Sequence, residues 1–310
     1  MDAAESLKAK ILELKKEKKA LIMAHYYQRE EIQEIADFIG DSLALARAAA
    51  KTDAPLIVMC GVHFMGETAK ILCPDKKVVV PDKEAGCSLA DSCDPDDLRN
   101  FIEQHPGYTV VSYVNTSAAV KALTDIVVTS GNARKVIDSL PADEKIIFGP
   151  DRNLGDYINR VTGRSMLLWN GACHVHDRFS LEKIMELKKQ HPGSKVLVHP
   201  ECRKPLQLIA DKVGSTAALL DYASKDDAQE FIVVTESGIL YEMRKKCPQK
   251  TFLAAPAEDA ECQCNECDYM KLNTLEKLYN ALLTEEPEIT VDPAIAEKAL
   301  RPIKRMLELS

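Results

Sequence analysis

Short apolar segments alternate with amphipathic ones along almost the whole chain. The apolar segments, such as ALIMA at 20–24 and LIVM at 56–59, have the length of buried strands. The segments between them carry apolar residues at the three- and four-residue spacing that is typical of helices. Strands that alternate with helices indicate an α/β protein with parallel sheets.

The predicted strands follow one another in the same order three times. The first strands are expected at 20–24, 109–112 and 195–198, the second at 56–59, 125–128 and 231–234, and the third at 77–80, 145–148 and 251–254. Each first strand runs straight into a helix, and each second strand turns through a loop of small residues into another. Such self-similarity indicates repeated modules.

A cysteine closes each repeat, at Cys87, Cys173 and Cys267. Regularly spaced strands occur in any α/β chain, but a cysteine that recurs in register favours triplication. The carboxyl ends of parallel strands are where ligands gather. We therefore predict three pseudo-threefold-related three-layer αβα modules, with small parallel sheets around one central site.

The module boundaries are expected at two turns, Pro106-Gly107 and Pro192-Gly193, each of which precedes a predicted strand. The first module then covers 1–106, the second 107–192 and the third 193–271. The residues at 272–310 are helical in period, and we expect them to pack back on the first module.

The charge balance excludes some classes of protein. The net charge is -8, and no basic stripe with interleaved aromatic residues is present, so nucleic acid is not an expected partner. The lysines at 15–19 read as the solvated face of an N-terminal helix. No apolar run reaches the ~18–20 residues of a membrane span, and no signal peptide is recognisable. We therefore expect a cytoplasmic protein without a membrane partner.

Ten cysteines in such a chain need an explanation other than disulfides, which seldom persist in the cytoplasm. Three thiolates at one centre suit zinc or an iron–sulfur cluster. Structural zinc sites usually use close cysteine pairs, and Cys87 and Cys173 have no partner in a C-x2-C pattern. One distant cysteine from each module fits a four-iron cluster better. Three protein ligands leave the fourth iron open as a Lewis acid.

The remaining cysteines are assigned by their positions. Cys262, Cys264 and Cys267 form C-x-C-x2-C, which alone could be half a zinc site or a redox pair. We take Cys267 as the cluster ligand, and Cys262 and Cys264 as spectators or a regulatory dithiol. Burial as small hydrophobic residues is the expectation for Cys60, which ends a strand, and for Cys73 and Cys247, which close helices. Cys202, in HPEC, lies near the expected site residues but has no partner in the other repeats, so we leave it out of the site.

Polar side chains follow several predicted strands. Short polar segments precede helices at Gly40-Asp41-Ser42, Asn115-Thr116-Ser117, Thr129-Ser130-Gly131 and Gly214-Ser215-Thr216. Each is either an ordinary helix cap or part of a site for carboxylates or phosphate. His25 with Tyr27, and His199 with Glu201, are either structural or proton-transferring pairs. His176, three residues after Cys173, is expected beside the cluster.

Many strings of this chain resemble those of the quinolinate synthase family. They run in the family's order over almost the whole chain: AHYYQ at 24–28, IADFIGDSLALAR at 35–47, FMGETAKIL at 64–72, YVNTSAAVKA at 113–122, VVTSGNA at 127–133, FGPDRNLG at 148–155, WNGACHVHDRF at 169–179, VHPEC at 198–202, VGSTAAL at 213–219 and MKLNTLEKL at 270–278.

The resemblance implies a [4Fe-4S] cluster on Cys87, Cys173 and Cys267. It also implies a set of substrate-handling positions: His25, Tyr27, Ser42, Tyr113, Asn115, Ser130, His176, His199, Glu201, Ser215 and Thr216. Family members differ in the number of cysteines around the third ligand, so the resemblance assigns no role to Cys262 and Cys264.

The activity that the resemblance implies belongs to NAD biosynthesis. Iminoaspartate, supplied by an aspartate-oxidising enzyme, condenses with dihydroxyacetone phosphate to give quinolinate, phosphate and water. Tyr27 with His25, and Glu201 with His199, are expected to move protons, while Tyr113 and Asn115 orient the intermediate. The alternatives are another [4Fe-4S] hydroxy-acid dehydratase and a non-catalytic iron or redox sensor.

Overall fold

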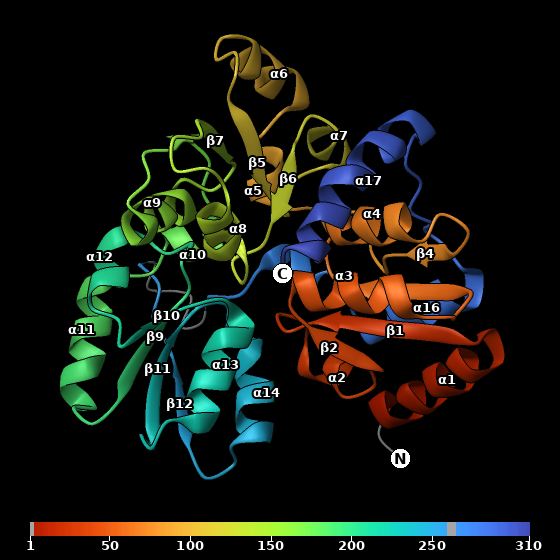
Figure 1. Ribbon diagram of the computed structural model, residues 1–310. Helices are drawn as coiled ribbons and strands as arrows, with labels where there is room; N and C mark the ends of the chain where they lie inside the picture. The colour runs from red at the N-terminus through yellow and green to blue at the C-terminus, as the bar shows by residue number, and fades with distance from the viewer. Residues whose placement is uncertain (1–2, 259–264) are drawn as a thin grey trace.

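The strands of the protein form three separate sheets of four parallel strands each. Figure 1 shows them in a computed structural model that describes residues 3–258 and 265–310. The strands are β1 (Ala20–His25), β2 (Phe38–Gly40), β3 (Leu56–Cys60) and β4 (Lys77–Val79) in the first sheet, β5 (Thr109–Tyr113), β6 (Ile126–Val128), β7 (Ile146–Gly149) and β8 (Leu167–Leu168) in the second, and β9 (Lys195–Val198), β10 (Lys212–Val213), β11 (Glu230–Val234) and β12 (Thr251–Ala254) in the third.

The three sheets share one topology. Their strand orders are β2-β1-β3-β4, β6-β5-β7-β8 and β10-β9-β11-β12, so the first strand always lies between the second and the third. The prediction of an α/β fold with small parallel sheets is confirmed. Figure 1 shows the first sheet in red and orange, the second in olive and green, and the third in teal and blue.

The predicted assignment of strands within the repeats was wrong in two respects. Each sheet has four strands rather than three, and β2, β8 and β10 were missed. These strands are three, two and two residues long, which is too short for a hydrophobic period to be recognised. The strand expected at 125–128 is β6, the counterpart of β2 and β10 rather than of β3 and β11.

Helices surround the sheets. They are α1 (Ala3–Lys18), α2 (Glu30–Gln33), α3 (Ser42–Lys51), α4 (His63–Leu72), α5 (Ser88–Asp91), α6 (Pro95–Glu103), α7 (Ala118–Lys121), α8 (Ala133–Ser139), α9 (Arg152–Thr162), α10 (His174–Asp177), α11 (Leu181–Gln190), α12 (Lys204–Leu208), α13 (Thr216–Lys225), α14 (Ile239–Lys246), α15 (Asp268–Lys271), α16 (Leu275–Thr284) and α17 (Pro293–Glu308).

Both faces of the third sheet are covered by helices. Residues of α13 and α14 pack on Leu197 and Val233, whereas residues of α11 and α12 pack on Val196 and Ile232, which face the other way. Figure 1 shows these two helix pairs on opposite sides of the sheet. Such strands are apolar on both faces because each face is buried.

One aspartate of each repeat ties its first two strands together. The carboxylate accepts the N–H of the residue fifteen positions earlier, at 2.8–2.9 Å in all three sheets. The pairs are Asp37 with Ile22, Asp125 with Val110, and Asp211 with Val196. The repeat therefore extends from strand order to single side-chain hydrogen bonds.

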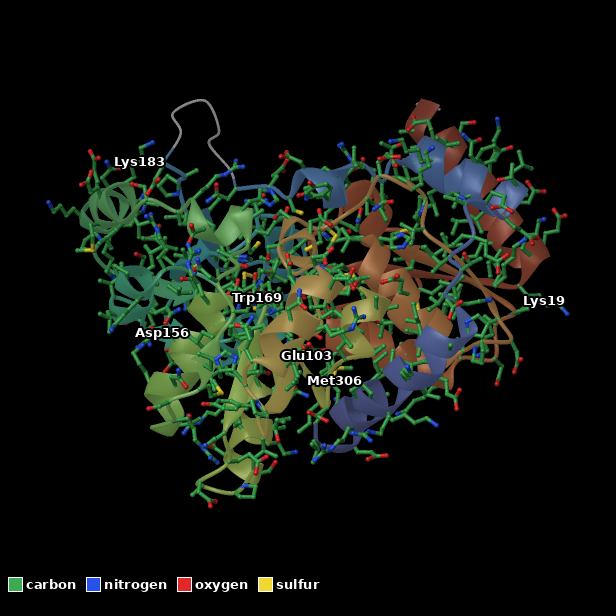
Figure 2. The ribbon with its side chains drawn as sticks, turned by 90° about the horizontal axis from the view of Figure 1, so that it is seen from above. Lys19, Glu103, Asp156, Trp169, Lys183 and Met306 are labelled. Carbon is green, nitrogen blue, oxygen red and sulfur yellow. The ribbon has the colours of Figure 1, made fainter. Side chains whose placement is uncertain are left out.

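The C-terminal helices lie against the earlier parts of the chain. α16 packs on α1 and β3, and α17 lies against α4, α7 and β6. Lys19 and Lys183, in the first and third parts of the chain, lie at opposite ends of the molecule, with Trp169 between them (Figure 2). Within the described residues, no helix combines the length and the apolar character needed to span a membrane.

Candidate metal centre and active site

One cavity lies among the three sheets, at the carboxyl ends of their strands. His25 and Tyr113 are the last residues of β1 and β5, and His199 directly follows β9. The predicted site residues that line the cavity are His25, Tyr27, Ser42, Cys87, Tyr113, Asn115, Ser130, Cys173, His176, His199, Glu201, Thr216 and Cys267. The volume of the cavity is about 60 Å³, several times the space that one water molecule needs.

Ser215 is the predicted site residue that does not line this cavity. It is the N-cap of α13, where its hydroxyl accepts the N–H of Ala218 at 3.3 Å. Ser117 likewise caps α7 through the N–H of Val120. At these two positions the hydroxyl acts as an ordinary helix cap, one of the two alternatives that the sequence left open.

The three cysteines reach the cavity in the same way. Cys87, Cys173 and Cys267 each directly precede a four-residue helix, α5, α10 and α15. Backbone N–H groups of these turns point at the sulfur atoms and favour the thiolate. The chain thus presents three sulfur atoms from three distant segments in one local geometry.

Burial keeps these thiols protonated unless a cation joins them. It raises the pKa of Cys87 to about 12 and that of Cys267 to about 11, and it also raises the pKa of Cys173. Cys267 also raises the pKa of Cys87, and both of them raise that of Cys173, in agreement with their place in the lining of one cavity. A bound metal group would ionise them, since coordinated thiols lose their proton. The donor set therefore fits a thiolate-bound metal cluster.

A second combination of potential ligands overlaps with this one. Atoms of Cys173, His176 and Glu201 lie within 4.8 Å of one another. However, His176 Nδ1 lies 3.1 Å from Glu201 Oε2, so these two side chains already pair with each other. The three cysteines are the better ligand set, because Cys87 and Cys267 have no such competing side-chain partner among the described residues.

The other cysteines are buried where the structure describes them. Cys60, Cys73 and Cys247 are buried, as predicted, and Cys202 is buried too. Cys93, to which the sequence assigned no role, is buried as well. Cys262 and Cys264 lie outside the described residues.

Two histidines at the cavity have the same local geometry. The Nδ1 atoms of His25 and His199 accept the backbone N–H groups of Tyr27 and Glu201, at 3.2 and 3.4 Å. Burial lowers the pKa of both histidines to about 3, so both rings are neutral at physiological pH. With the lone pair on Nδ1, each ring carries its proton on Nε2 and acts as a hydrogen-bond donor there.

Glu201 is the anion at the centre of the polar network. Its side chain is 4% exposed, Tyr113 Oη donates to its Oε1, and His176 Nδ1 faces its Oε2. Burial alone raises the pKa of Glu201, but the contact with His176 and the hydrogen bond from Tyr113 lower it to about 2. The carboxylate is therefore ionised throughout the physiological range.

Comparison with known proteins identifies the family to which this chain belongs. The family model described as Quinolinate synthetase A protein matches residues 9–308. The chain belongs to this family.

Curated relatives in the quinolinate synthetase A family agree with the match. A quinolinate synthase of Chloroherpeton thalassium is 55% identical over 300 residues, which cover 97% of this chain and 93% of the relative. One of a Synechocystis species is 54% identical over 97% of this chain and 94% of the relative. A quinolinate synthase of Thermosynechococcus vestitus is 53% identical over 98% of this chain and 95% of the relative.

The sequence analysis missed two buried carboxylates at the site of this member of the quinolinate synthetase A family. Asp151 and Glu236 are both fully buried, and each accepts the N–H of a cysteine at 3.2 Å, Cys173 and Cys267 respectively. Glu236 also lies 3.0 Å from Lys271 Nζ. Both follow a central strand, β7 or β11, and this position is the signal that could have found them.

Proposed function

We propose that the protein is a quinolinate synthase, which condenses iminoaspartate with dihydroxyacetone phosphate to quinolinate with loss of phosphate and water. The observation that carries the proposal is the single cavity, where three distant cysteines meet hydroxyl groups, two neutral histidines and an ionised glutamate. The full-length family match supports the same activity.

Cys87, Cys173 and Cys267 would hold a [4Fe-4S] cluster in this proposal. The position of all three at the same cavity, each directly before a four-residue helix, supports it. A cationic group would offset the burial that raises the pKa of these thiols. When bound, the cluster supplies one iron without a protein ligand, a Lewis acid for a substrate oxygen.

Hydroxyl groups of the cavity are proposed to bind the anionic groups of the substrates. Ser42, Ser130 and Thr216 line it, and Ser130 Oγ lies 3.3 Å from His199 Nε2. The Nε2–H groups of His25 and His199 add donors for carboxylate or phosphate oxygens. The substrate role of Ser215 stays a prediction. Its hydroxyl caps α13, and Ser215 does not line the cavity.

Tyr27 and Glu201 are proposed to handle protons. Burial raises the pKa of Tyr27 well above its ordinary value, so the phenol keeps its proton and can donate it. Glu201 is an ionised carboxylate and can accept one. Tyr113 donates to Glu201, and together with Asn115 it is proposed to orient the intermediate.

The threefold repeat explains how one cavity receives these groups. We propose that modules at 1–106, 107–192 and 193–271 are related by a pseudo-threefold axis through the site. The shared strand order and the recurring aspartates support this relation. The residues at 272–310 are assigned to the first module, although α17 also lies against β6 and α7.

The cellular setting follows from the chemistry. Iminoaspartate is unstable, so an enzyme that oxidises aspartate has to supply it. Reduced thiols, which the proposed ligands need, persist in the cytoplasm. We therefore propose a cytoplasmic enzyme.

The experiment is an anaerobic preparation assayed for iron, sulfide and visible absorbance, and then for quinolinate from aspartate, an aspartate oxidase and dihydroxyacetone phosphate. Cys87→Ser, Cys173→Ser and Cys267→Ser are expected to lose iron and activity together. Cys93→Ser, a change at another buried cysteine, is the matched control and should keep both. A wild-type protein that binds the cluster but forms no quinolinate would refute the activity, and iron retained in all three variants would refute the ligand set.

A further inference from the structure

The hydroxyl of Thr235 joins two side chains of the proposed site. Thr235 directly follows β11 and is 2% exposed. Its Oγ1 lies 2.7 Å from Tyr27 Oη and 2.9 Å from His176 Nε2. Thr235 is not among the residues that line the cavity. Its contacts therefore serve the two neighbouring side chains rather than a ligand directly.

These contacts connect all three sheets of the fold. Tyr27 follows β1, His176 lies on α10 after β8, and Thr235 follows β11. The positions of Tyr27 and Thr235 are 208 residues apart in the chain. A single hydroxyl at the meeting point of three segments can set the relative position of their side chains.

The direction of the hydrogen bonds follows from the Glu201 carboxylate, which can only accept. His176 Nδ1 lies 3.1 Å from Glu201 Oε2 and 3.3 Å from Cys173 Sγ, so Nδ1 carries a proton that is directed at the carboxylate. Thr235 Oγ1 is the hydrogen-bond partner of Nε2, the other nitrogen of the ring.

The Tyr27 phenol has two threonine partners. Its Oη lies 2.7 Å from Thr235 Oγ1 and 2.7 Å from Thr216 Oγ1. Two hydrogen-bond partners, one after β11 and one at the start of α13, fix the position of the phenol oxygen.

We propose that Thr235 is a positioning residue, which holds the Tyr27 phenol and the His176 ring in fixed orientations. This inference rests on the proposed function, because it assigns Tyr27 and His176 to the reacting site. It adds a residue that does not line the cavity.

Thr235→Val tests the proposal, because it removes the hydroxyl and nearly keeps the shape. We expect kcat for quinolinate formation to fall on the order of 10²-fold, the effect of misplacing a reacting group by about 1 Å. KM should stay unchanged, since the residues that line the cavity remain. Thr235→Ser restores the hydroxyl and should recover most of the lost kcat.

Thr124→Val is the matched control. Thr124 is a buried threonine with two hydrogen bonds, to Ser112 Oγ and to the Val120 carbonyl. Both valine variants should lower the melting temperature to a similar extent, whereas only Thr235→Val should lower kcat. Equal kcat in Thr235→Val and wild type, or no recovery in Thr235→Ser, would overturn the proposal.

A second measurement does not depend on activity. In the reduced protein without metal, ¹⁵N NMR of the histidine rings, assigned with His176→Gln, should show a changed Nε2 shift of His176 in Thr235→Val and the wild-type shift in Thr235→Ser, because only the valine removes the hydrogen-bond partner of Nε2. An unchanged Nε2 shift in Thr235→Val would overturn the proposal. If the wild-type protein makes no quinolinate, the proposed function fails, while the NMR result still decides the role of Thr235. If Thr235→Val does not fold, Thr235→Ala is measured in the same way.

Discussion

Lys271 is the cation of a buried ion pair beside the proposed metal centre. Its Nζ lies 3.0 Å from Glu236 Oε1 and 2.8 Å from the Tyr27 carbonyl oxygen. The side chain of Lys271 is 12% exposed and that of Glu236 is 0% exposed. Lys271→Met removes the charge and keeps most of the apolar length, and it leaves the carboxylate without its cation.

The magnitude follows from this geometry. Breaking a buried pair by removing one partner costs about 3–5 kcal/mol. The lower end applies, because Glu236 still accepts the N–H groups of Gly238 and Cys267. At about 2.1 cal/mol/K per residue, the unfolding entropy of 310 residues is about 0.65 kcal/mol/K. A loss of about 3 kcal/mol therefore lowers the melting temperature by about 5 °C.

The assay is calorimetric unfolding of the reduced protein without metal, for wild type, Lys271→Met, Glu236→Gln and the double variant. The loss caused by Lys271→Met should shrink in the Glu236→Gln background, because no buried charge is then left unpaired. Lys225→Met is the control, since Lys225 and its partner Asp221 are exposed, and no measurable change is expected. A melting temperature of Lys271→Met equal to that of wild type, or the same loss in both backgrounds, would refute the reasoning.

Three further variants test other parts of the structure. Burial lowers the pKa of Lys121 from 10.5 to about 8, so the unfolded chain binds more protons between these values and wild-type stability rises with pH there. In unfolding experiments between pH 8 and 10.5, the free energy of unfolding of Lys121→Met should not rise with pH in this way. The same rise in wild type and in Lys121→Met would contradict the burial of the Lys121 charge. Gly238→Ala would place a Cβ 2.8 Å from the backbone of Tyr27, so we expect a loss of about 1–3 kcal/mol in unfolding experiments together with lower kcat; unchanged values would show that the close approach is absent. Tyr113→Phe removes the phenol donor to Glu201, and kcat in the quinolinate assay should fall by at least about tenfold, the effect of a lost hydrogen bond to a charge; full turnover would exclude that donor from the reaction.

The sequence determined those features that depend on long segments or on side chains next to them. Strands such as β3 and β11 are apolar over four or more residues, and their burial on both faces makes them recognisable. Cys87, Cys173 and Cys267 could be chosen because they recur at the same place in three repeats. The residues at the carboxyl ends of the first strands, such as His25, could be expected at the site because parallel strands direct these ends to one edge of the sheet.

The tertiary structure alone decided which side chains meet across the repeats. β8 and β10 are two residues long, so their strand conformation comes from pairing with β7 and β9 and not from a local pattern. Glu236 has its role because Cys267 and Lys271, more than thirty positions later in the chain, fold back onto it. Thr235 joins Tyr27 to His176 for the same reason: hydrogen bonds between distant positions depend on packing, and hydrophobic periodicity does not encode them.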